Sequence, residues 1–157
     1  MTRLEDILKE GVCLVGIGNP MRRDDGVGVW LAERLKGASW PVFVVEDVPE
    51  NFVADIARSE WRNVVFIDAV AADLEPGAVV FGDLAEVGEQ QGLSTHKLAL
   101  SLCGRYLEAY GKRAFLLGIV PGDLDFGSGL TPEVERAAAG VRDLVLGMRA
   151  PLHGEIG

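Results

Sequence analysis

The chain has 157 residues, 48% hydrophobic and 25% charged, a composition typical of one globular domain. Its 24 acidic and 15 basic residues leave a net charge of −9, which disfavours nucleic acid as a partner because like charges repel. No apolar run approaches the roughly 20 residues of a membrane-spanning helix. The acidic, amphipathic start MTRLEDILKE also differs from a secretory signal, so we expect a cytoplasmic protein with no membrane partner.

The first half of the chain alternates between helical patterns and apolar, β-branched runs. Helices are predicted over residues 2–10 and 52–59. A third is expected to begin after a cap by Asp24 or Asp25 and to end at about Lys36. Strands are predicted over residues 12–17, 42–48 and 63–69. The third run, NVVFIDA, is apolar almost throughout, which is typical of a strand buried on both faces of a parallel sheet.

The second half begins with a turn at Pro76-Gly77 and a short strand over 78–81, which the tight turn suggests is antiparallel. Residues 83–95 have no clear period and are interpreted as a mobile loop. Ser94 or Thr95 is expected to cap a helix over 96–110. Its inward face is expected to hold Ala99, Cys103, Leu107 and Tyr110.

The last predicted strand covers residues 113–120, and a glycine-rich loop follows it. Thr131-Pro132-Glu133 is a typical helix start, with a cap, a proline at the first position and an acid in the first turn. We therefore expect a single three-layer α/β/α domain over residues 1–150, with a mostly parallel, twisted sheet of about five strands. Residues 151–157, which include His153, are expected to form a disordered tail.

Three residues with chemical potential follow different strands of this sheet. Asp25 comes just after the first strand, Asp68 ends the third, and His96 begins the helix after the fourth. Sites in open α/β sheets form beyond the carboxyl ends of the strands, so these side chains can converge there. Two carboxylates and one imidazole suit a divalent first-row metal with positions left open for substrate or water.

Each of these residues also has a structural interpretation. Asp24 and Asp25 could cap a helix, Asp68 could accept hydrogen bonds from loop amides, and His96 could be a donor at a helix start. One shared site accounts for all of them together.

Other chemistry finds little support in the chain. The segment GIGNPM lacks the third glycine of a dinucleotide fingerprint, and no Walker A sequence or G-x-S-x-G elbow occurs. Arg22-Arg23 is interpreted as part of a solvated loop. Cys13 and Cys103 are too few and too far apart for a disulfide framework or zinc cluster, and we expect both in the core.

Four segments, in order, resemble the NiFe-hydrogenase maturation endopeptidases: GIGNPMRRDDGVG, FIDAV, LSTHKLAL and LLGIVPGDLDFGSGLTPEVERA. The similarity covers roughly residues 12–148. It implies a protease that removes the carboxy-terminal extension of a hydrogenase large-subunit precursor after nickel insertion. The metal would then be nickel supplied by that precursor, with no organic cofactor. A bound metal can polarise a carbonyl or activate water, which would replace the absent nucleophile.

The resemblance also assigns roles to residues. Asp25, Asp68 and His96 would be both the metal-contacting and the catalytic residues. The loop that supports them would contain Gly16, Gly18, Asn19, Asp24 and Gly26. We expect a monomer whose contacts with the precursor come from residues 83–94 and 122–129. The strand over 78–81 could accept an extended peptide along its edge.

Two other functions remain to be compared with this one. Peptidyl-tRNA hydrolases also begin with a strand running into GxGNP, but this chain lacks their downstream histidine–asparagine pairing and is acidic. A receiver-like switch domain with an acid pair would be phosphorylated on Asp68. It would need a lysine at the end of the last strand, where this chain has Gly118-Ile119-Val120.

Overall fold

The computed structural model describes residues 3–46, 52–86, 93–94 and 96–148. Its strands are β1 (Val12–Ile17), β2 (Val42–Glu46), β3 (Asn63–Ala71), β4 (Val79–Asp83), β5 (Leu93–Ser94) and β6 (Arg113–Ile119). Its helices are α1 (Leu4–Glu10), the 3-10 helix η1 (Arg23–Gly26), α2 (Val27–Leu35), α3 (Val53–Ala57), α5 (Lys97–Ala109) and α6 (Pro132–Leu146). None of the helices so described is long and apolar enough to cross a membrane.

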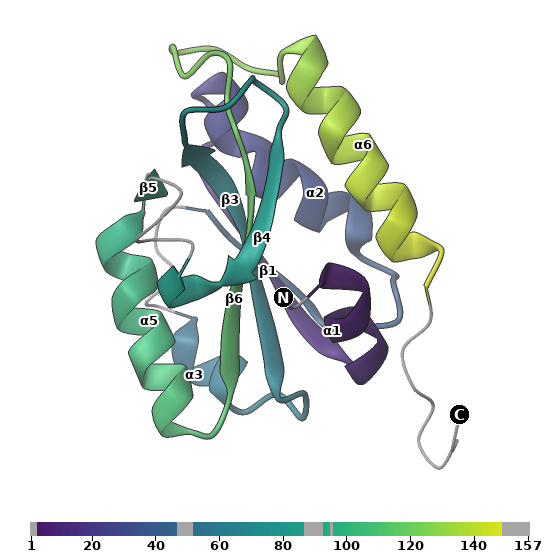
Figure 1. The fold of residues 1–157 in the computed structure, drawn as a ribbon, viewed down its shortest axis with the longest axis vertical. Helices are drawn as coiled ribbons and strands as arrows, with labels where there is room; N and C mark the ends of the chain where they lie inside the picture. The colour runs from purple at the N-terminus through teal and green to yellow at the C-terminus, as the bar shows by residue number, and fades with distance from the viewer. Residues whose placement is uncertain (1–2, 47–51, 87–92, 95, 149–157) are drawn as a thin grey trace.

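The sheet has the mostly parallel topology that the sequence predicts. Five strands follow the order β2-β1-β3-β6-β4, and β5 pairs with the end of β3. The strands β2, β1, β3 and β6 are parallel, whereas β4 runs antiparallel to β6. The carboxyl ends of the parallel strands therefore share one edge, at the top of Figure 1.

Helices cover both faces of this sheet, which confirms the three-layer architecture. Helices α1, α2 and α6 lie on one face and α3 and α5 on the other (Figure 1). In β3, Val65, Ile67 and Ala69 face the first layer, and their neighbours Phe66 and Val70 face the second. Because side chains two positions apart in a strand lie on the same face, Asp68 lies on the face of Phe66 and Val70 and is directed toward the α5 layer.

Close packing of α2 on the sheet requires two glycines. A Cβ atom on Gly28 would clash with the carbonyl oxygens of Ile17 and Ile67. A Cβ atom on Gly16 would clash with the Gly28 carbonyl oxygen and the Ala32 side chain. The start of α2 thus lies directly against the carboxyl ends of β1 and β3.

Several predicted element ends are wrong. Neither Asp24 nor Asp25 caps α2: the chain forms η1 first, and Gly26 is the N-cap. His96, not Ser94, is the N-cap of α5, because Ser94 belongs to β5. Tyr110 is 62% exposed and does not join the inward face of α5.

The segment interpreted as a mobile loop is partly regular. β4 continues to Asp83, residues 84–86 are helical, and β5 follows at 93–94. Three predictions concern residues outside the described part of the chain: the substrate contacts within 87–92, the cap by Thr95 and the tail over 151–157.

Candidate functional site

Asp25 is held by a compact loop between β1 and η1. Its Oδ2 accepts a hydrogen bond of 3.1 Å from the Asn19 amide, and its own amide donates to the Arg22 carbonyl at 3.0 Å. Gly18 has a φ of 140°, and a Cβ atom there would clash with the Asp25 carbonyl oxygen. Asp25 is 1% exposed, so the loop fixes a carboxylate at low solvent access.

Asp68 and His96 meet directly. His96 Nδ1 lies 3.2 Å from Asp68 Oδ2, and Asp68 Oδ1 accepts a hydrogen bond of 2.9 Å from the Ala69 amide. The Asp68 side chain is fully buried, and 13% of the His96 side chain is exposed. The antiparallel pairing of Val70 with Ser94 returns the chain to the end of β3, which places His96 beside Asp68.

Asp25 lies at the same edge of the sheet as this pair. β1 and β3 are adjacent parallel strands in which Gly16 pairs with Ile67, and η1 packs against β3. The structure therefore joins Asp68 and His96 and puts Asp25 after the neighbouring strand. In the part of the chain that is described, no three His, Cys, Asp or Glu side chains form a group that could hold a metal ion. A shared three-ligand site remains a prediction.

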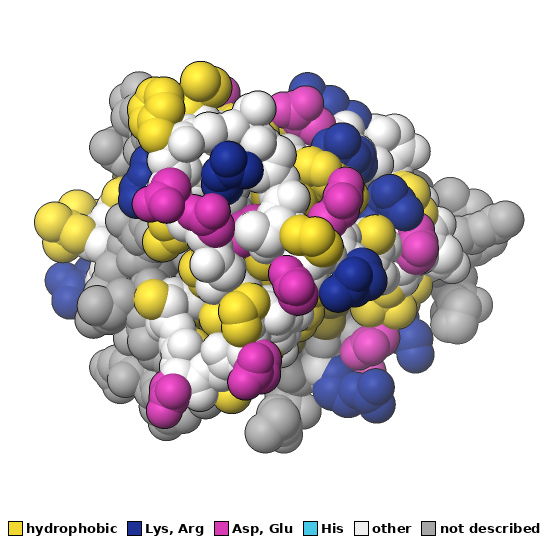
Figure 2. Space-filling view, turned by 90° about the horizontal axis from the view of Figure 1, so that it is seen from above, with side chains coloured by type: hydrophobic (Ala, Val, Ile, Leu, Met, Phe, Trp, Pro, Cys, Tyr) yellow, Lys and Arg dark blue, Asp and Glu magenta, His cyan; other side chains and the backbone are white. Residues whose placement is uncertain are grey.

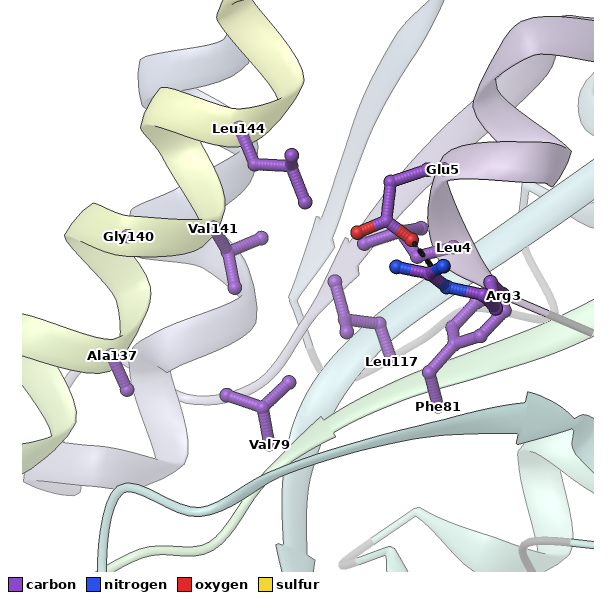
Figure 3. A pocket seen from close by; sticks show the side chains of 10 residues that line it. All are labelled: Arg3, Leu4, Glu5, Val79, Phe81, Leu117, Ala137, Gly140, Val141 and Leu144. Atoms are coloured by element: carbon purple, nitrogen blue, oxygen red, sulfur yellow. Dashed lines mark ion pairs between the residues drawn. The ribbon is translucent and has the colours of Figure 1, made fainter.

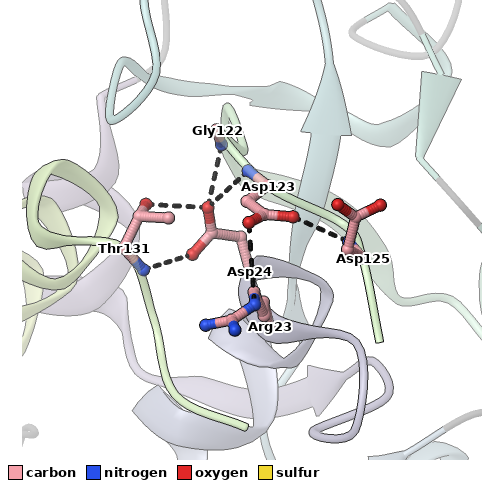
Figure 4. Close-up of polar contacts among 6 residues, drawn as sticks. All are labelled: Arg23, Asp24, Gly122, Asp123, Asp125 and Thr131. Atoms are coloured by element: carbon pink, nitrogen blue, oxygen red, sulfur yellow. Dashed lines mark hydrogen bonds and ion pairs between the residues drawn. The ribbon is translucent and has the colours of Figure 1, made fainter. Parts of the chain in front are cut away.

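Asp24 has a different environment from its neighbour Asp25. Its carboxylate accepts four hydrogen bonds of 2.8–3.0 Å, from the amides of Gly122, Asp123 and Thr131 and from the Thr131 hydroxyl (Figure 4). The side chain is completely buried. Asp24 thus joins the loop after β1 to the loop after β6 and to the N-cap of α6. The expected supporting role is therefore structural, and its partners were not predicted.

Backbone contacts join the same two loops. Arg22 and Gly127 form a parallel β-bridge, with Arg23 N donating to Gly127 O at 3.0 Å. The Arg23 backbone has a positive φ of 45°, a conformation that costs energy for a residue other than glycine. Its guanidinium lies 3.6 Å from the Asp123 carboxylate (Figure 4). Together these contacts hold the loop after β6 against the segment that carries Asp25.

A hollow of about 490 Å³ lies elsewhere, between α1, α6 and β4 (Figure 3). Val79, Phe81, Leu117, Val141 and Leu144 make it largely apolar, and the ion-paired Arg3 and Glu5 lie at its rim. Asp25, Asp68 and His96 are absent from its lining. The chemistry of the predicted residues therefore does not belong to this hollow.

The cysteines are unsuited to nucleophilic chemistry. Cys13 and Cys103 are both buried thiols. Burial raises the pKa of Cys13 to about 12, against smaller opposing effects of Ser59 and Lys112. Since the thiolate is the reactive form, Cys13 is inert near neutral pH.

Comparisons with known proteins agree on one family. The family model for hydrogenase maturation proteases matches residues 42–148. The hydrogenase 3 maturation protease of Escherichia coli K12 is 30% identical over 128 residues, covering 79% of this chain and 81% of its own length.

Solved structures give the same result. The crystal structure of the NiFe-hydrogenase maturation protease HycI from Thermococcus kodakarensis aligns with a TM-score of 0.77 at 28% identity, covering 92% of this chain and 99% of that one. The solution structure of the endopeptidase HycI from Escherichia coli has a TM-score of 0.73 at 27% identity, covering 87% and 90%.

Proposed function

This chain belongs to the hydrogenase maturation protease family and is a peptide hydrolase, and we propose that nickel carried by its substrate directs its cleavage. Proteases of this family act on the precursor of the hydrogenase large subunit, so the substrate is a protein. In our proposal the enzyme removes the carboxy-terminal extension only after nickel has been inserted. The receiver-like and peptidyl-tRNA hydrolase-like alternatives are not favoured by any of the matches.

The contact between Asp68 and His96 is the observation that carries this proposal. It unites a buried carboxylate and an imidazole from distant parts of the chain at 3.2 Å. The contact uses Nδ1 of His96, so in our proposal Nε2 would be the ring nitrogen that contacts the metal. A metal-binding histidine commonly has its second nitrogen held by a carboxylate, which fixes the orientation of the ring, and Asp68 would have this role in addition to contacting the metal.

Asp25 would supply the other carboxylate. It is 1% exposed and follows β1, the strand adjacent to β3, which carries Asp68. Carboxylates with such low solvent access attract a cation more strongly than exposed ones, because little water screens their charge. We propose that Asp25, Asp68 and His96 contact the nickel of the precursor, which reaches them as part of the substrate.

This arrangement would make recognition and hydrolysis depend on the same residues. A divalent metal polarises a nearby carbonyl and lowers the pKa of bound water. The chain itself supplies two buried thiols and no serine elbow, so it has little nucleophilic chemistry of its own. A precursor without nickel would therefore be neither recognised nor cleaved. We further propose that the enzyme acts as a monomer in the cytoplasm.

A processing assay tests the proposal. The purified protein is incubated with nickel-loaded and nickel-free forms of the large-subunit precursor from the same organism, and mass spectrometry follows release of the terminal peptide. We expect release from the nickel-loaded form alone. Free Ni²⁺ added to the nickel-free precursor is the control and should not restore cleavage. Equal cleavage of both forms would overturn the role of nickel.

A further inference from the structure

Two exposed apolar side chains lie on the paired loops at the carboxyl edge of the sheet. Met21 is 52% exposed and Phe126 is 80% exposed. Met21 comes from the loop after β1, Phe126 from the loop after β6, and Gly127 N donates to Met21 O at 2.8 Å. Figure 2 views the molecule from this edge and shows apolar side chains exposed among acidic and basic ones. We call Met21 and Phe126 the loop patch.

The loop patch is fixed relative to Asp25. Met21 lies in the Asn19–Asp25 loop, where its amide donates to the Asn19 side chain at 2.9 Å. The loop of Phe126 is attached to that segment by the Arg22–Gly127 bridge and by the hydrogen bonds of Asp24. A partner protein that contacts the loop patch is therefore held in a defined position relative to Asp25, a candidate metal-contacting residue.

We propose that the loop patch is a docking surface for the folded hydrogenase large-subunit precursor, where an apolar area beside its nickel-bearing segment covers Phe126. This inference rests on the proposed function. Phe126 is 80% exposed, and aromatic side chains that become buried in apolar surroundings dominate the energy of many protein interfaces. Docking there would deliver the nickel to Asp25 on the same rigid support.

The position of the loop patch favours the precursor over a second copy of this chain. The patch is on the segment that carries Asp25, and a partner bound there covers the carboxyl edge of the sheet. A second copy in that place would block access of a large protein substrate, whereas the precursor must approach this edge for cleavage. Of the two possible partners at the loop patch, the precursor is therefore the one whose binding is compatible with cleavage.

The experiment measures processing kinetics of Phe126→Ala, Phe126→Asp and Tyr110→Ala with the nickel-loaded precursor. Tyr110 is the matched control, an aromatic residue 62% exposed at the end of α5 that lies near the opposite edge of the sheet. We expect the KM of Phe126→Ala to rise roughly tenfold, and that of Phe126→Asp to rise more, with kcat little changed. Tyr110→Ala should retain the wild-type KM, and all variants should keep their thermal midpoints.

The outcomes separate the two proposals. If the wild-type protein cleaves the precursor and the Phe126 variants have its KM, the docking surface is wrong and the proposed function stands. Absence of cleavage by the wild-type protein would overturn the proposed function and the docking surface with it. A concentration-dependent dimer that Phe126→Asp abolishes would assign the loop patch to a second copy and also overturn the inference.

Discussion

His96 Nδ1 lies 3.2 Å from Asp68 Oδ2, although 28 positions separate the two residues in the chain. The contact depends on β5, which pairs with the last residues of β3 and brings the start of α5 back to the end of that strand. Asp25 follows the adjacent strand β1. Substitutions at these positions test whether the three residues act together in one site.

Replacement of any one of the three residues should stop processing without unfolding the protein. We expect Asp25→Asn, Asp68→Asn and His96→Ala each to lower the rate of precursor cleavage by ~100-fold or more, since each would remove a group that contacts the metal. Asp73→Asn, an exposed carboxylate, is the control and should cleave normally. Near-normal cleavage by all three variants would refute the assignment.

Asp24 should be important for stability. Asp24→Ala would leave three backbone amides and one hydroxyl without their buried acceptor, so the free energy of unfolding should fall by about 3–5 kcal/mol. Asp24→Asn keeps one acceptor oxygen and should lose about half as much. Urea denaturation measures both, with Asp73→Ala as the exposed control. Equal stability of Asp24→Ala and the control would contradict this role.

Two glycine substitutions should have opposite effects. Gly28→Ala would force a Cβ atom into the carbonyl oxygens of Ile17 and Ile67, so it should destabilise the fold by about 3 kcal/mol or more. Gly140→Ala, in α6, meets open space and should stabilise the protein by about 0.5–1 kcal/mol because alanine favours helix. Thermal denaturation compares the two. If Gly28→Ala had the same thermal midpoint as the wild type, the close contact of α2 with β1 and β3 would be refuted.

The buried thiol of Cys13 should make stability fall at alkaline pH. Burial raises the pKa of this thiol from 9.0 to about 12, so above pH 9 the unfolded chain releases a proton that the folded protein keeps. Stability from this group is complete below pH 9 and declines as the pH rises. Between pH 8 and 10.5 the wild type should therefore lose about 2 kcal/mol more than Cys13→Ala. If the urea midpoints of the two proteins changed equally with pH, the thiol would not contribute to the pH dependence of stability.

Much of the fold could be predicted because its signals are local. The unbroken apolar run that ends in Asp68 indicates a strand buried on both faces, and the tight turn at Pro76-Gly77 indicates the antiparallel β4. The order of the motifs then placed Asp25, Asp68 and His96 after different strands. These inferences needed no knowledge of side-chain contacts.

The remaining features depend on contacts between distant segments. β5 has only two residues, too few for any alternation to appear in the sequence. The partners of Asp24 lie 98–107 positions further along the chain, so a helix cap was the simpler local interpretation. Phe126 looks like any other residue of a glycine-rich loop until the bridge between Arg22 and Gly127 places it beside Met21.

The most direct test of the account is nickel X-ray absorption of the loaded precursor, frozen immediately after mixing with an equal amount of enzyme. We predict that wild-type protein adds nitrogen and oxygen scatterers to the nickel spectrum, including an imidazole contribution that His96→Ala does not produce. An unchanged nickel spectrum in a sample that goes on to release the terminal peptide would contradict it.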